Sequence, residues 1–142
     1  MIFDKEFIWY SDHFVYHITK TSNIDSIRQK GLIPLCGDRS RLVGDTRKAI
    51  YFLDYPYNIE EWVDVLFENS DKNNLELLRF NLKRRKWYIG GCYEDGEYYT
   101  MNPVLPNRID LLRRIDENGD IYTLDDIVKQ KKLIWEPLKK LQ

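Results

Sequence analysis

Three short segments, far apart in the chain, each carry one side chain suited to holding a nucleotide. They span residues 15–19, 49–53 and 96–100. Each is rich in β-branched or aromatic residues, as strands usually are. Their distinctive groups are the imidazole of His17, the phenol ring of Tyr51 and the carboxylate of Glu97. If the three strands are neighbours, these groups can form one site.

Length and composition set the frame for that site. The chain has 142 residues, so we expect a single domain over 1–142 that contains all the chemistry. A hydrophobic content of 43% with 32% charged residues is typical of a soluble globular protein. The formal net charge is −1, so no overall charge draws the protein to nucleic acid or to an anionic membrane.

The cysteines and the N-terminal residues bear on location. Cys36 and Cys92 lack metal-ligand spacing and indicate neither a metal site nor a disulfide framework. Asp4, Lys5 and Glu6 interrupt the apolar N-terminal stretch, so we expect no signal peptide, no membrane span and a cytoplasmic protein.

Periodicity and turn residues predict a mixed α+β order. A helix is expected to begin at Ser22 as its N-cap and to end at Gly31, with a second helix from Asn58 and a short one after Thr123. Strands are expected over 14–18, 49–53, 75–82, 87–89, 98–101 and 109–112. Between them, the polar segment 35–48 is expected to be a mobile loop.

The flanks of the three segments carry a resemblance to a known family. Residues 17–32 are similar to a His-Gly-Ser strand followed by a helix and a Gly-Leu stop, and 47–54 to a Gly-Lys-Gly-Ile-Tyr-Phe-Ala-Asp segment. Glu97-Tyr98, followed by Asn102-Pro103 and by residues 108–112, looks like a strand that carries a catalytic glutamate. The chain thus resembles the ADP-ribosyltransferase superfamily over about residues 15–114, in particular its diphtheria-toxin and poly(ADP-ribose) polymerase branch.

The resemblance implies a fold and an activity. The fold would be a split β-sandwich of two antiparallel sheets with short flanking helices. The activity would be mono-ADP-ribosyl transfer from NAD, with release of nicotinamide, to an acceptor on a protein, a nucleic acid or a small molecule. A toxin with an antitoxin or immunity partner is one such role.

The same resemblance implies roles for individual residues. Glu97 would stabilise the oxocarbenium-like charge that develops at the ribose. Tyr51 would stack on the nicotinamide, with Tyr55 or Tyr57 on the other side. His17 would hydrogen-bond the adenosine ribose.

Further contacts would hold the rest of NAD. The main chain of Ile18 and the hydroxyl of Thr19 would bind the carboxamide, although Ile18 replaces the family's glycine. Three arginines of the 35–48 loop, Arg39, Arg41 and Arg47, would contact the phosphates.

Alternative interpretations remain open. His17, Thr19 and the run Gly31-Leu32-Ile33-Pro34 also resemble a tRNA 2′-phosphotransferase, in which arginines would bind phosphate. An inactive module that only binds NAD, ADP-ribose or a partner is a second alternative. A metal site of His13 and His17 would have an incomplete ligand shell. The basic run 83–86 is interpreted as a solvated turn, with phosphate binding as the alternative.

Overall fold

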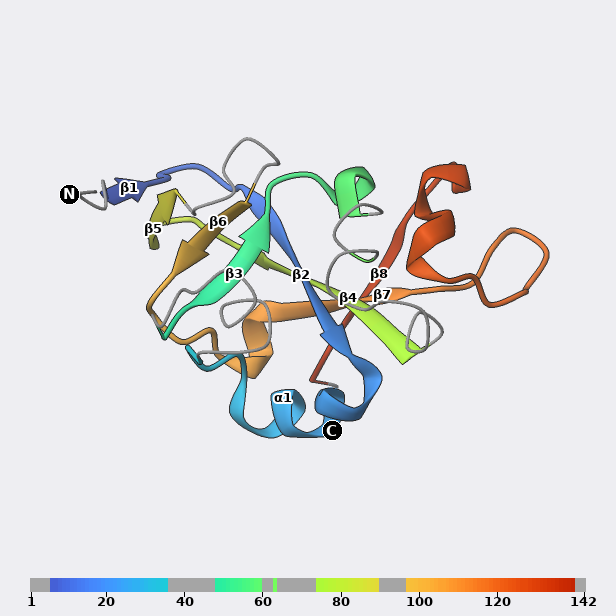
Figure 1. The fold of residues 1–142 in the computed structure, drawn as a ribbon, viewed down its shortest axis with the longest axis horizontal. Helices are drawn as coiled ribbons and strands as arrows, with labels where there is room; N and C mark the ends of the chain where they lie inside the picture. The colour runs from blue at the N-terminus through green and yellow to red at the C-terminus, as the bar shows by residue number, and fades with distance from the viewer. Residues whose placement is uncertain (1–5, 36–47, 60–62, 64–73, 90–96, 140–142) are drawn as a thin grey trace.

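The computed structural model describes residues 6–35, 48–59, 63, 74–89 and 97–139 (Figure 1). The strands in this part form one eight-stranded antiparallel sheet in the order β1-β5-β6-β3-β2-β4-β7-β8. They are β1 (Glu6–Ile8), β2 (Phe14–Lys20), β3 (Ile50–Leu53), β4 (Leu75–Asn81), β5 (Lys86–Ile89), β6 (Glu97–Thr100), β7 (Ile109–Arg113) and β8 (Ile134–Pro137). With the helix α1 (Ile24–Lys30), they confirm the predicted α+β class.

The sheet consists of two four-stranded halves with a narrow joint between them. One half is β1-β5-β6-β3 and the other is β2-β4-β7-β8. Strand β2 pairs with β4 over its whole length, from Phe14 to Lys20, but with β3 only at Tyr16 opposite Leu53. The prediction of two separate sheets is thus corrected: the described strands form one hydrogen-bonded sheet, within which β2 parts from β3 after a single backbone pair.

A row of aromatic rings crosses the joint on one face. The ring centroids of Phe7 and Trp87 lie 4.6 Å apart, those of Trp87 and Tyr98 5.2 Å, and those of Tyr98 and Phe52 6.0 Å. Phe52 then meets the edge of Phe80 of β4 at 5.7 Å. These contacts bury both halves in one core and compensate for the short backbone ladder at the joint.

Each face of the sheet has its own cover. Ile24 and Ile27 of α1 pack into the core that contains Phe52 and Phe80. A second core, which includes Leu53, Leu77 and Leu112, lies under the 3₁₀ turns η2 (Pro56–Asn58) and η6 (Leu124–Lys129). Figure 1 shows α1 at the bottom of the view and these turns, green and orange-red, at the upper right.

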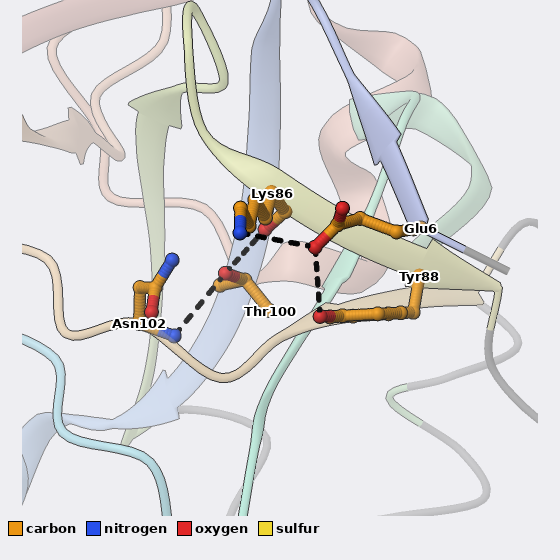
Figure 2. A network of polar contacts seen from close by, with 5 residues as sticks. All are labelled: Glu6, Lys86, Tyr88, Thr100 and Asn102. Atoms are coloured by element: carbon orange, nitrogen blue, oxygen red, sulfur yellow. Dashed lines mark hydrogen bonds and ion pairs between the residues drawn. The ribbon is translucent and has the colours of Figure 1, made fainter. Parts of the chain in front are cut away.

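The outer strands of the first half are joined by polar contacts (Figure 2). The Glu6 carboxylate of β1 forms an ion pair with Lys86 Nζ and accepts a hydrogen bond from the Tyr88 hydroxyl, both at 3.4 Å. The Thr100 hydroxyl donates to the Lys86 carbonyl at 2.8 Å and accepts from the Asn102 N–H. These contacts hold the edge strand β1 against β5, where the backbone ladder is short.

Most predicted elements are confirmed, with corrections at their ends. Ser22 is not the N-cap, because residues 21–23 form a 3₁₀ turn and α1 begins after Asn23, whose side chain bonds Thr19. The segment after Thr123 is the 3₁₀ turn η6. Of the helix expected from Asn58, only a few residues are described, and Ile59 and Val63 among them are buried. No helix in the described ranges has the length and apolarity to cross a bilayer.

Gly31 ends α1 as the sequence predicts, and its neighbours leave no space for a side chain. Its φ is 77°, a conformation that favours glycine. A Cβ there would lie 2.0 Å from the Val104 carbonyl oxygen. That oxygen accepts the Leu32 N–H at 2.9 Å, so the clash would break the pairing that ties the end of α1 to the segment after β6.

We expect Gly31→Ala to lower the free energy of unfolding by more than about 3 kcal/mol, because it adds a backbone clash to the cost of a positive φ. Gly119→Ala is the matched control, since Gly119 has a φ of 83° and nothing within 4 Å of an added Cβ. It should cost only about 1–2 kcal/mol. Urea unfolding measures both, and equal losses would contradict the steric argument.

Candidate functional site

The three predicted segments lie on three adjacent strands. His17 is on β2, Tyr51 on β3 and Glu97 at the start of β6, and these strands are neighbours in that order. In register, Tyr16 pairs with Leu53, which pairs with Glu97. The sheet thus places all three segments at the joint between its halves.

His17 makes a direct link across this joint. Its Nδ1 lies 2.6 Å from the carbonyl oxygen of Tyr51. A carbonyl oxygen only accepts, so Nδ1 carries the proton and Nε2 of the neutral ring keeps a lone pair. Burial lowers the pKa of His17 below 6.5, against the smaller opposing effect of the Tyr51 carbonyl. The imidazole is therefore neutral at pH 7 and can accept a hydrogen bond at Nε2.

This link takes the place of backbone pairing. If the register set by Tyr16 and Leu53 continued, Ile18 would lie opposite Tyr51, but the described parts of β2 and β3 have no pairing beyond that one position. The strands part there, and the imidazole hydrogen-bonds the carbonyl at the opening. A continuous ladder would pair the backbone groups of both strands there, whereas in the described residues the β2–β3 ladder stops at Tyr16 and Leu53.

Tyr51 itself is partly buried beside other tyrosines. Its ring is tilted at 5.7 Å from that of Tyr99, its partner in register, and Tyr99 stacks on Tyr88 at 5.1 Å. Tyr51 therefore contacts His17 through its carbonyl, while its ring belongs to a tyrosine row that extends over β3, β6 and β5. That row fixes the ring and lowers the entropy cost of stacking a ligand on it.

The remaining predicted contacts are spread around the joint. Thr19 is 6% exposed, and its hydroxyl accepts a hydrogen bond from Asn23 Nδ2 at 3.2 Å. Ile18 is partly buried against the second core. Tyr55 is half exposed and lies 5.4 Å from Tyr57, which packs on the second core.

Several predicted residues lie outside the described part of the chain. These are Cys36, Arg39, Arg41, Arg47 and Cys92, together with the side chain of Glu97. The described residues contain no cluster of His, Cys, Asp and Glu that could hold a metal, and His13 stacks on Trp9 at 4.7 Å.

A buried ion pair beside Thr19 was not predicted from the sequence. Glu76 lies opposite Thr19 in register and is paired with Arg114, Nε to Oε1 at 3.0 Å. Arg114 also donates from Nη1 to the Tyr122 carbonyl at 2.8 Å. An acidic residue inside the apolar run 75–78 was the available signal, because a charge among buried positions needs a partner.

Comparisons with known proteins give little. No protein-family model matches the chain, and no curated protein matches it. Among solved structures it is similar to the chain EcPltA, with a TM-score of 0.48 and 13% identity over 80% of this chain and 83% of that one. A similarity this low does not establish a function.

The His17 link predicts how stability depends on pH. Because the pKa of His17 is lowered in the folded state, the unfolded chain binds more protons as pH falls below about 6.5. The free energy of unfolding should therefore fall from pH 7.5 to pH 5.5, and His17→Gln should reduce that dependence. Urea unfolding at both pH values measures the effect.

The chain has two histidines, so His13→Gln is the matched control for the loss of an imidazole that does not link β2 to β3. A parent-like pH dependence in His17→Gln would show that the imidazole is not held neutral by the fold.

Proposed function

We propose that this protein transfers ADP-ribose from NAD to a nucleophile on another molecule. The observation that carries the proposal is the His17 Nδ1 contact with the Tyr51 carbonyl, which couples the first two motifs at the point where β2 and β3 part. The third motif, on β6, is adjacent to β3. The sequence resemblance supplies the class of reaction.

The reaction places specific demands on such a site. The bond between C1′ of the ribose and the nicotinamide nitrogen breaks, and the electron pair leaves with nicotinamide, which becomes neutral. The acceptor nucleophile forms the new bond to C1′ and releases its proton. Positive charge develops at the ribose between these events, and a carboxylate close to it lowers the barrier. We assign that task to Glu97.

The neutral His17 has a defined task in this proposal. Its Nε2 lone pair accepts a hydrogen bond from a ribose hydroxyl while Nδ1–H donates to the Tyr51 carbonyl. The hydrogen bond to Tyr51 of β3 thus orients the imidazole, and with it the Nε2 atom that would meet the ribose hydroxyl. A protonated ring would offer no acceptor to the hydroxyl.

Other residues would complete binding. Tyr51 would stack on the nicotinamide, and Tyr55 and Tyr57, as a tilted pair after β3, would close its other side. The main chain at Ile18 would hold the carboxamide where β2 has parted from β3. Arg39, Arg41 and Arg47 would neutralise the phosphates.

Glu97→Gln separates catalysis from binding. It keeps the size of the side chain and removes its charge, so we expect nicotinamide release from NAD to fall by about a hundred- to a thousand-fold, with NAD affinity little changed. Release is measured with labelled NAD, and affinity by calorimetry.

Glu117→Gln is the charge-matched control, because Glu117 is exposed in the turn after β7. Tyr51→Ala should weaken NAD binding as well as turnover, by on the order of 1 kcal/mol in affinity. Unchanged nicotinamide release in Glu97→Gln, with the parent active, would remove Glu97 from the mechanism. No release by the parent despite NAD binding would favour the binding module.

A further inference from the structure

A second surface, around the start of β2 and the turn before β5, combines exposed rings with positive charge. We call it the aromatic–basic surface, and it consists of Trp9, Tyr10, His13, Phe14, Lys83 and Arg84. Trp9 is 40% exposed, Tyr10 74% and Phe14 39%, whereas side chains of this size are usually buried. Lys83 and Arg84 are exposed as well.

The backbone holds the two parts of this surface together. Trp9 forms a parallel bridge with Lys83, and the Arg84 N–H donates to the Trp9 carbonyl. Four residues on, the His13 carbonyl accepts the Leu82 N–H at 2.8 Å. Paired chain segments lie about 4.8 Å apart, so the ring-bearing segment 9–14 directly flanks the basic turn.

Two of the rings, Trp9 and His13, form a stacked platform. Trp9 and His13 are stacked with centroids 4.7 Å apart and planes only 7° from parallel. Phe14, next along the chain, lies over the Arg79 guanidinium at 4.3 Å, and Arg79 is paired with Asp110 at 2.8 Å. Preformed planar surfaces of this kind suit the face of an unstacked base.

The charges of the surface are only partly balanced. Among the described residues, Lys83 and Arg84 have no ion pair, whereas the next lysine, Lys86, is paired with Glu6 (Figure 2). The one carboxylate within the segment 9–14 is Asp12, which accepts a hydrogen bond from Asn81 Nδ2 at 3.0 Å. The turn therefore keeps two cationic groups against one anion.

The backbone of Arg84 has a conformation that is uncommon for residues other than glycine. Its φ is 60°, and it is the non-glycine residue with positive φ in the described part of the chain. A glycine or asparagine would take this conformation more readily, so the position keeps an arginine where the backbone favours other residues. Local strain of this type is typical of positions selected for a contact.

We propose that the aromatic–basic surface binds single-stranded nucleic acid without sequence preference. Bases stack on the Trp9–His13 platform and on Tyr10, while Lys83 and Arg84 contact the adjoining phosphates. Single strands fit better than duplexes, because stacking needs bases that are already exposed. The overall charge of −1 does not oppose this, since the contact depends on local charge. The inference does not rest on the proposed NAD chemistry.

The test uses the full chain and a labelled oligothymidylate of roughly 16 nucleotides, the upper end of site sizes for such surfaces. Fluorescence anisotropy should show binding at low salt. Trp9→Ala and Tyr10→Ala should each weaken it by about five- to a hundred-fold. The log of the affinity falls linearly with the log of the salt concentration, by about 0.7 for each phosphate contact to a single strand. The double variant Lys83→Gln with Arg84→Gly loses two such contacts, so its slope should be shallower by about 1.4.

The variants allow clean controls. Arg84→Gly keeps the positive φ, so loss of charge is not confused with loss of the turn. Lys131→Gln with Lys132→Gln removes the same charge from an exposed segment before β8, on the opposite side of the view from β1 (Figure 1). This control should bind like the parent.

Several outcomes would overturn the inference. They are absence of binding by the parent at low salt, equal weakening in the Lys131/Lys132 control, tighter binding of a duplex of the same length, and unchanged affinity in Trp9→Ala and Tyr10→Ala. A shift to a smaller oligomer in Trp9→Ala with unchanged oligonucleotide binding would assign the surface to a second copy of the chain instead.

Discussion

The arrangement of this protein depends on how β2 and β3 separate. They share one backbone pair, Tyr16 with Leu53, and then diverge. At the opening the imidazole of His17 hydrogen-bonds the Tyr51 carbonyl, so a side chain links the two strands where their backbone pairing has stopped. This hydrogen bond therefore joins the two halves of the sheet beyond their one shared backbone pair.

The rest of the fold supports the opening from both sides. On one face, the ring row from Phe7 through Phe52 to Phe80 keeps the two halves together. On the other, Tyr51 is packed against Tyr99 and Tyr88. Opposite Thr19, the ion pair between Glu76 and Arg114 links the start of β4 to the segment after β7. Side chains held by packing around the point where the strands part would preorganise a ligand site there.

The sequence predicts the central strands well, because alternation and β-branched or aromatic residues mark them. Phe14–Lys20 and Leu75–Asn81 differ from the expected ranges only at their ends. The edge strands Glu6–Ile8 and Ile134–Pro137 were missed, since they are short and half exposed and carry little periodicity. The prediction from Ser22 was wrong because a capping-box pattern does not reveal the 3₁₀ turn that moves the N-cap one residue on, to Asn23.

The candidate site was predictable in its parts and not in its geometry. Motif order suggested that His17, Tyr51 and Glu97 belong together, and their strands are adjacent. That His17 meets the main chain of Tyr51, and not its ring, depends on where the backbone ladder stops, which no local pattern encodes. The aromatic–basic surface likewise arises from a bridge between residues 9 and 83, far apart in sequence.

The most direct test of the account is nitrogen NMR of the two imidazoles during titration with NAD, with His13→Gln used for assignment. We expect His17 to be the neutral Nδ1–H tautomer at pH 7, and its Nε2 resonance to shift as NAD binds, while the His13 resonances stay unchanged. An Nε2 resonance that does not move at saturating NAD would contradict a nucleotide site at the parting of β2 and β3.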